Sequence, residues 1–215
     1  MEKLLTETIA NLDSLFSKNE LAYLALTTKI ELPIRDKWAF KLYETLNPEN
    51  IVVSREWRRT DLAIIEDNSP KVLIELKAMY TFDAFFKQED ISGYAEKLFC
   101  DIKKSKDLCM KVYEEEVQKT KEKGIEVEKR DTQIYSVLLA THPKGIIDKK
   151  MARVIKYSSA INRSLKEHSE KQVKDIANKA VLRNLGNHEI ITYGELDAGE
   201  AFGVETSVLY WIIKA

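Results

Sequence analysis

The chain has 215 residues, of which 44% are hydrophobic, and its 34 basic and 35 acidic residues leave a net charge of −1. This length predicts a single domain over residues 1–215, and the apolar fraction excludes an intrinsically disordered chain. No apolar run approaches the roughly 20 residues that a bilayer-spanning helix needs, so we expect no membrane partner.

The amino-terminal residues carry acidic and amide side chains throughout, so we expect no signal peptide. The two cysteines, Cys100 and Cys109, are too few for a zinc site and badly spaced for a disulfide across a helix. These features favour a cytoplasmic protein in a reducing environment.

The first part of the chain has the apolar spacing of helices. This spacing predicts helices over residues 2–16 and 19–30. Pro33 suits the first turn of a third helix, which we expect to end at Asn47-Pro48. The pattern then changes to short β-branched runs. It predicts three antiparallel strands, over Ile51–Trp57, Thr60–Ile65 and Lys71–Lys77.

The second half of the chain alternates between helix and strand patterns. It predicts a helix over residues 82–123, with a break at Gly93 and a stop at Gly124, and then a buried strand over 133–141. A basic helical segment follows over 147–184 and ends near Gly186, and the last two elements are strands over 189–193 and 207–213. This order predicts an α/β (α+β) domain with a mixed central sheet flanked by helices.

Three charged residues stand out at one end of the predicted hairpin that joins Thr60–Ile65 to Lys71–Lys77. The two strands are apolar on both faces, which is typical of central, buried strands. Glu75 and Lys77 are two residues apart, so they project from the same face. A turn near residue 68 brings Asp61 beside them.

The length of the turn decides which face Asp61 occupies. A strict four-residue loop pairs Asp61 with Leu76 and places the aspartate on the face opposite to Glu75. A three- or five-residue loop, a bulge, or a bend beyond the sheet brings it to the same face as Glu75. We expect one of these.

Two carboxylates beside an apolar core need a compensating cation, because buried like charges repel each other. Mg²⁺ takes carboxylate oxygens and keeps several waters, which can hold a phosphate and an attacking hydroxide. The ammonium group of Lys77 can orient that water or stabilise charge on the phosphate. The alternative interpretation is a solvated hairpin end with a surface Glu–Lys pair.

The pattern acid-x-Lys occurs three times, at Glu75–Lys77, Asp101–Lys103 and Asp148–Lys150. The last two fall on predicted helices, where residues i and i+2 do not face each other. Glu75–Lys77 is the one that lies on a predicted buried strand.

The segment Arg59–Ile65, followed by Glu75-Leu76-Lys77, resembles the PD-(D/E)xK signature of restriction-endonuclease-like nucleases, with Thr60 in place of the proline. The resemblance covers roughly residues 20–141, and it implies the mixed central sheet of that superfamily. By this resemblance, Asp61 and Glu75 would be ligands of Mg²⁺ (or Mn²⁺), the carbonyl of Leu76 a further ligand, and Lys77 the water-activating group.

Members of the superfamily often add a glutamate from the preceding helix, and the candidates are Glu20, Glu31 and Glu44. We favour Glu31 as a further catalytic residue, because it falls on the apolar stripe of the third helix. The alternative is a carboxylate that stabilises the amino terminus of a helix.

Two features bear on a nucleic-acid partner. Arg58 and Arg59 precede Asp61 and could hold a phosphodiester, or could pair with nearby acids. A basic helical segment at about 144–186 includes, from Lys144 to Arg183, eleven basic and four acidic residues, a net charge of +7. Such a segment permits a phosphate-backbone partner, although a solvated helical face is the simpler explanation of the charge taken alone.

These observations predict a metal-dependent endonuclease that hydrolyses phosphodiester bonds of DNA, such as a restriction or defence enzyme. Duplex DNA is the expected partner, and one site per chain favours a homodimer for cutting both strands. The alternative is a catalytically inactive nucleic-acid-binding or assembly module of the same fold. The complete set of Asp61, Glu75 and Lys77 favours the enzyme.

Overall fold

The computed structural model describes residues 1–46, 49–87, 90–121, 131–186 and 188–215. Within these ranges the elements are, in chain order, α1 (Glu2–Ala10), the short 3₁₀ helix η1 (Leu12–Leu15), α2 (Glu20–Thr27), α3 (Glu31–Leu46), β1 (Ile51–Trp57), β2 (Thr60–Glu66), β3 (Ser69–Tyr80), α4 (Thr81–Phe86), α5 (Ser92–Lys121), β4 (Gln133–Pro143), the 3₁₀ helix η2 (Lys149–Met151), α6 (Ser158–Glu167), α7 (Glu170–Leu185), β5 (Glu189–Ala201) and β6 (Val204–Lys214).

The described strands form one mixed sheet in the order β1-β2-β3-β4-β6-β5. β3 and β4 are parallel, and every other neighbouring pair is antiparallel. The α4–α5 connection between β3 and β4 provides the crossover that a parallel pair requires. β3 therefore lies inside the sheet, between β2 and β4.

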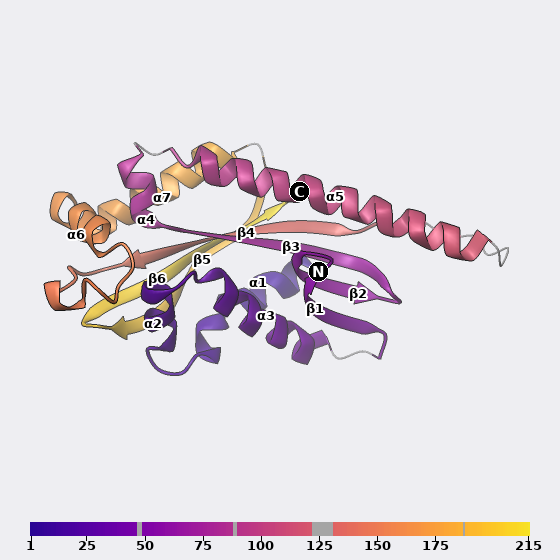
Figure 1. Ribbon diagram of the computed structural model, residues 1–215, viewed down its shortest axis with the longest axis horizontal. Coiled ribbons are helices and arrows are strands. Elements are labelled where there is room, and N and C mark those ends of the chain that lie inside the picture. The colour runs from indigo at the N-terminus through magenta and orange to yellow at the C-terminus, as the bar shows by residue number, and fades with distance from the viewer. Residues whose placement is uncertain (47–48, 88–89, 122–130, 187) are drawn as a thin grey trace.

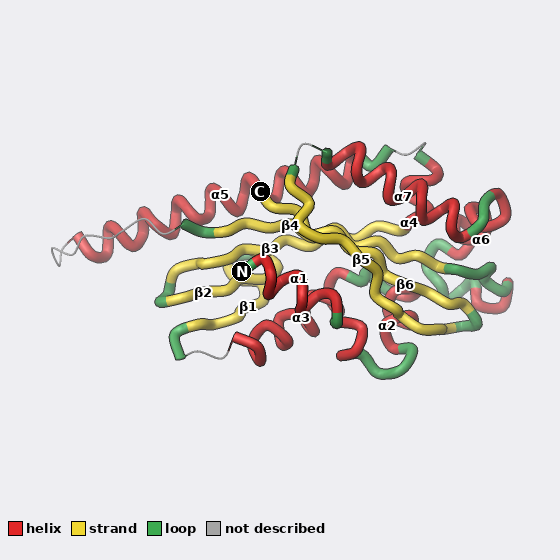
Figure 2. The backbone as a smooth tube through the Cα atoms, turned by 180° about the vertical axis from the view of Figure 1, so that it is seen from behind, coloured by secondary structure: helices red, strands yellow, loops and turns green. Residues whose placement is uncertain are grey.

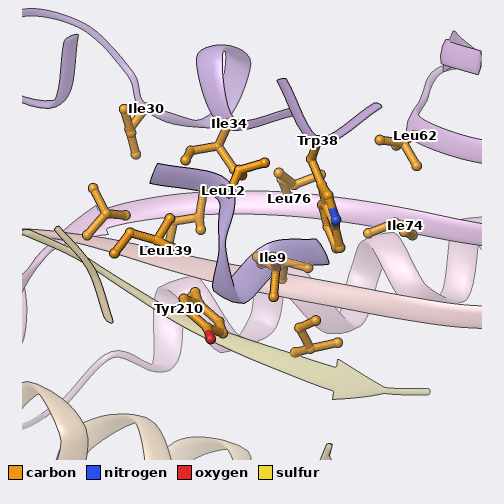
Figure 3. Close-up of a cluster of buried hydrophobic side chains, with 14 of the residues drawn as sticks. Ile9, Leu12, Ile30, Ile34, Trp38, Leu62, Ile74, Leu76, Leu139 and Tyr210 are labelled. Atoms are coloured by element: carbon orange, nitrogen blue, oxygen red, sulfur yellow. The ribbon is translucent and has the colours of Figure 1, made fainter. Parts of the chain in front are cut away.

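Helices α1, α2 and α3 cover one face of the sheet, and α4, α5 and α7 cover the other (Figures 1 and 2). The first face carries the larger core, in which Trp38 of α3 packs against Ile74 and Leu76 of β3 (Figure 3). The indole nitrogen of Trp38 donates a hydrogen bond to Oγ1 of Thr8, 2.8 Å away, so burial leaves this polar atom satisfied.

The second face carries a core built from β3, β4 and β6 against α4, α5 and α7, including Met79, Leu138 and Trp211. Helix α5 is much longer than this core and continues along the β2–β3 hairpin (Figure 1). Its side chains there contact the face of the hairpin that bears Ala63 and Leu73. Both faces of the hairpin are therefore covered.

The broad prediction of a mixed sheet flanked by helices is confirmed, as is the three-stranded antiparallel meander. Several boundaries were wrong. The helix expected over residues 82–123 is divided into α4 and α5, and Gly93 lies at the second residue of α5 instead of at the break. The stops expected at Asn47-Pro48 and Gly124 lie outside the described residues.

The basic segment at about 144–186 is not one helix. It starts with an extended stretch and η2, and only then forms α6 and α7, which are separated by the Ser169 cap. The two carboxy-terminal strands are longer than predicted. In β5 the added half is largely polar and does not show the apolar pattern of buried strands, and β6 begins three residues earlier, at Val204. No helix in the described ranges is long and apolar enough to cross a bilayer.

Candidate active site

The β2–β3 hairpin has a tight turn and a bulge. Asp67 and Asn68, with φ of 49° and 64°, form a two-residue loop between the paired residues Glu66 and Ser69. Positive φ at both positions is the mark of a type I′ turn, which matches the twist of the strands. A uniform register from this turn would place Asp61 opposite Ile74, among residues of the α3 face.

A register shift between Ile64 and Ile65 corrects this alignment. Ile65 pairs with Pro70, whereas Ile64 pairs with Val72, so β3 contributes one extra residue, Lys71. Beyond the bulge Leu62 pairs with Ile74, and Asp61 therefore stands beside Glu75. The expectation that a bulge brings Asp61 to the face of Glu75 is confirmed.

Asp61 and Glu75 form a closely spaced pair of carboxyl groups on the α5 face. Glu75 is 8% exposed. Burial, the neighbouring charge of Asp61 and a hydrogen bond with Asp61 raise the pKa of Glu75 to about 8, against an ordinary value of 4.5. The other carboxylate is anchored, because Oδ2 of Asp61 accepts a hydrogen bond from the backbone N–H of Leu76 at 2.8 Å.

Lys77 lies on the same face, held by two contacts. Its ammonium nitrogen donates to the carbonyl oxygen of Leu76 at 3.1 Å and lies 2.7 Å from Oδ2 of Asp101 on α5. Burial opposes the charged form, but the hydrogen bond and charge of Asp101, with the charges of Asp61 and Glu75, raise the pKa of Lys77. Lys77 is therefore a fixed cation beside the carboxyl pair.

Asp101 is the residue of this group that sequence reasoning missed. It belongs to the second acid-x-Lys triplet, whose acid and lysine do not face each other on a helix. The side chain is 13% exposed and also pairs with Lys104, at 2.7 Å. Although burial acts in the opposite direction, the hydrogen bonds from Lys104 and Lys77 lower the pKa of Asp101. Its position between the buried residues Leu98 and Ile102 was the available signal.

Glu31 lies in the first turn of α3, and its Oε1 accepts a hydrogen bond from the backbone N–H of Ala78 at 2.6 Å. The glutamate therefore reaches the strand that bears Glu75 and Lys77, but from the α3 side. Of the other candidates, Glu20 accepts a hydrogen bond from the backbone N–H of Ser17 at 2.8 Å. Glu44 is exposed on α3.

The end of β2 explains why carboxylates gather here. β2 begins at Thr60, whereas β3 continues to Tyr80, so the last part of β3 has no strand beside it on the β2 side. The N–H groups of Leu76 and Ala78 are satisfied instead by Asp61 and Glu31. Because buried backbone N–H groups need hydrogen-bond acceptors, these side chains take the place of a neighbouring strand.

The donor set fits a hard divalent cation, though it is small. Across the described part of the chain, no group of three or more His, Cys, Asp and Glu side chains is arranged to hold an ion. The protein ligands would be the carboxylates of Asp61 and Glu75 and the carbonyl of Leu76. Mg²⁺ accepts few protein ligands because it retains waters. The close pairing of the buried Glu75 with the partly buried Asp61, which raises the pKa of Glu75, is the observation that favours such an ion.

Two cavities adjoin Lys77. One, of about 530 Å³, contains the carboxyl pair, and it is lined by Asp61, Glu75, Lys77 and Asp101 together with cations of the β1–β2 turn and of α5. The other, of about 440 Å³, lies beyond Lys77 and includes Glu31 and Ala78. Lys77 lines both, so the two cavities meet at this residue.

The two arginines predicted to hold nucleic acid differ in their contacts. Both line the larger cavity. Arg58 forms a bidentate ion pair with Glu115 of α5, with distances of 3.0 and 2.8 Å. Arg59 is exposed and has no ion-pair partner in the part of the chain that the structure describes. Arg59 is thus the arginine available to a ligand.

Most of the basic segment at about 144–186 lies at the opposite end of the sheet from the β2–β3 turn (Figure 1). Lys144 and Lys174 both pair with Glu195. Lys156 is the basic residue of this segment that lines a cavity beside Lys77. The excess positive charge of the segment is therefore partly neutralised by the fold.

Comparisons with known proteins add no relative: no family model, no curated protein and no solved structure matches the chain.

Proposed function

We propose that this chain is a metal-dependent endonuclease of the PD-(D/E)xK type, which hydrolyses phosphodiester bonds of DNA. One observation carries the proposal. A pair of carboxyl groups, the buried Glu75 and the partly buried Asp61, lies beside the fixed ammonium group of Lys77 at the open end of a central hairpin. A charged hairpin end without function has no need to bury such a pair.

The arrangement of strands supports the same superfamily. The aspartate lies on β2, the Glu-x-Lys triplet on the adjacent antiparallel β3, and β3 is followed by a helix and the parallel strand β4. We propose on this basis that the domain has the restriction-endonuclease-like fold.

In the proposed reaction each residue has a separate role. Asp61, Glu75 and the carbonyl of Leu76 would hold Mg²⁺, for which Mn²⁺ could substitute. The ion would lower the pKa of the water bound to it and would neutralise charge on the phosphate. Lys77 would orient the attacking water and donate to the phosphate oxygen as negative charge develops there. Asp101 would keep the Lys77 ammonium in place.

The hydrogen-bonded anchors limit where the reacting groups sit. Asp61 is fixed by the N–H of Leu76, so the position of its carboxylate is set before a ligand binds. Glu75 titrates with a pKa of about 8, so a cation bound there would displace a proton near neutral pH. We expect cleavage to increase with pH through this range.

The test is cleavage of supercoiled plasmid and of linear DNA by the wild type, in Mg²⁺ and in chelator. We expect cleavage in Mg²⁺ alone, and none by Asp61→Asn or Lys77→Ala. Two exposed substitutions on α7, Asp175→Asn and Lys179→Ala, match these changes in chemistry and should cleave normally. Equal cleavage by Lys77→Ala and the wild type would exclude the proposed role of the lysine.

A binding or assembly module without hydrolysis is the second candidate. The contact of Lys77 with Asp101 favours it, because a paired ammonium has less freedom to assist a reaction. If the wild type binds DNA in both conditions but leaves plasmid intact with Mg²⁺ and with Mn²⁺, this module is the better description.

A further inference from the structure

The cavity beyond Lys77 has a chemistry of its own. It lies where the loop before α3, the end of β3, the start of α5 and the segment before α6 meet, and its volume is about 440 Å³. We call it the lysine cavity and define it by Lys29, Glu31, Lys77, Lys97, Lys156 and Tyr157. Neither the carboxyl pair of Asp61 and Glu75 nor Asp101 lines it.

The lysine cavity presents cations that the protein itself does not neutralise. Lys29, Lys97 and Lys156 are exposed, and none of them forms an ion pair with any residue in the described ranges. The nearby carboxylates are used internally. Glu31 accepts from the N–H of Ala78, and Asp83 accepts from the N–H of Tyr80 and the hydroxyl of Tyr94.

Aromatic rings accompany these lysines. Tyr157 is 51% exposed, and its ring packs edge-on against Tyr80 with the ring centroids 5.4 Å apart. The ammonium of Lys156 lies 4.9 Å from the centre of the Tyr157 ring, and that of Lys97 lies 5.7 Å from the Tyr94 ring. Lysines beside accessible rings are the combination that binds single-stranded nucleic acid, because the bases stack while the cations contact phosphates.

We propose that the lysine cavity is a phosphate-binding subsite for a nucleic-acid strand whose neighbouring phosphodiester lies at the carboxyl pair. The subsite rests on the proposed nuclease function and specifies how the substrate is held. Lys97 and Lys156 would contact a phosphate, and a flanking base would stack on Tyr157. The phosphate is either internal to the strand or at its end.

The position of Lys77 favours a strand over a small free anion. Lys77 lines both cavities, and the cavity of the carboxyl pair is itself lined by Arg59, Lys104 and Lys111. Cations therefore lie on both sides of the carboxyl pair. A ligand that meets both groups must carry negative charge along its length, as a phosphodiester backbone does.

The test measures binding in chelator, where no cleavage occurs. Short single-stranded DNA with a 5′-phosphate, with a 3′-phosphate or with hydroxyl ends is titrated against the wild type by fluorescence anisotropy. The double variant Lys97→Ala/Lys156→Ala is compared with Lys166→Ala/Lys179→Ala, which removes two exposed lysines from α6 and α7. All four side chains are exposed, so both variants should fold.

We expect the cavity variant, Lys97→Ala/Lys156→Ala, to bind DNA roughly tenfold more weakly or worse. The slope of its log affinity against log salt concentration should become shallower by roughly 1.4, as the loss of two single-strand phosphate contacts predicts. The control variant should bind like the wild type. Dependence on one terminal phosphate would identify an end-binding subsite, and equal loss for all three strands would identify an internal one. Equal affinities of the two double variants would overturn the proposal.

Failure of the subsite and failure of the nuclease proposal give different results. If the wild type never cleaves but the cavity variant still loses affinity selectively, the subsite holds and the nuclease proposal fails. If the wild type cleaves and the cavity variant cleaves with unchanged KM and unchanged affinity, the subsite alone is wrong.

Discussion

The ammonium nitrogen of Lys77 lies 2.7 Å from Oδ2 of Asp101, a carboxylate that α5 contributes from outside the hairpin. The contact joins the strand that carries the Glu-x-Lys triplet to the helix that covers it. The position of the lysine relative to Glu75 therefore depends on how α5 packs, as well as on the strand itself.

Asp101→Asn should lower kcat by roughly tenfold to a hundredfold, because the amide keeps the shape of Asp101 but loses the charge that positions Lys77, and loss of such a supporting partner costs about this much. Because Asp101 raises the pKa of Lys77, the basic limb of the pH–rate profile should move to lower pH. Glu96→Gln, an exposed acid-to-amide change on the same helix, is the control. An unchanged profile in Asp101→Asn would show that the contact is only structural.

Glu75 should make the metal-free protein less stable as the pH rises. Its pKa is about 8 in the folded protein and 4.5 ordinarily, so between these values the folded state holds a proton that the unfolded state has lost. The free energy of unfolding should fall across this window by up to about 1.4 kcal/mol per pH unit.

Urea denaturation in chelator at several pH values measures this slope. Glu75→Gln should remove most of it, because the amide does not titrate, whereas Glu96→Gln should retain it. If wild type and Glu75→Gln share one pH dependence, the carboxyl groups are not coupled as the geometry indicates.

Asp61→Asn should abolish the thermal response to Mg²⁺. In chelator above about pH 8, where Glu75 is ionised, the variant should melt at the same temperature as the wild type or higher, because the amide relieves repulsion against Glu75 and can still accept from the N–H of Leu76. Saturating Mg²⁺ should stabilise the wild type by about 2.7 kcal/mol at a hundredfold excess over Kd, and the variant should respond little. Equal shifts in both proteins would place the ion elsewhere.

Arg59→Gly should stabilise the fold and weaken DNA binding. Arg58 and Arg59, with φ of 48° and 75°, occupy a two-residue turn that glycine or asparagine fits better. Relief of this strain is partly offset by the entropy cost of glycine, so the free energy of unfolding should rise by at most about 1 kcal/mol.

Arg59→Ala is the matched comparison, because it removes the same cation and leaves a non-glycine residue at positive φ. Both variants should lose DNA affinity to the same extent, and only Arg59→Gly should gain stability in urea. Full affinity in both would remove Arg59 from the proposed DNA-binding surface.

The central hairpin was predictable because its strands are buried on both faces, so they read as continuous apolar runs in which Asp61, Glu75 and Lys77 are conspicuous. Residues whose positions depend on distant packing were not. Asp101 lies 24 residues after Lys77, on a different element. Its place among the buried residues of α5 indicates a side chain that faces inward, but no local pattern identifies a strand lysine as its partner.

The length of β5 was also hidden, for a different reason. β5 is an edge strand, and much of its outer half is exposed or partly exposed and carries residues such as Glu195 and Asp197. Its pairing with β6 rests on backbone hydrogen bonds, which leave little trace in the side-chain pattern. By contrast, the sequence narrows the pairing register of β2 and β3 to a few alternatives, one of which is a bulge, and the structure places that bulge at Lys71.

The bulge at Lys71 makes the hairpin more sensitive to changes of length than to changes of residue. Thirteen residues separate Asp61 from Glu75, and most of them serve only as packing. Deletion of any single one would keep Asp61, Glu75 and Lys77 in the sequence and yet move Asp61 to the opposite face of the sheet. Loss of two would restore the alignment. Among relatives that keep this chemistry, the parity of this spacing should vary less than the residues within it.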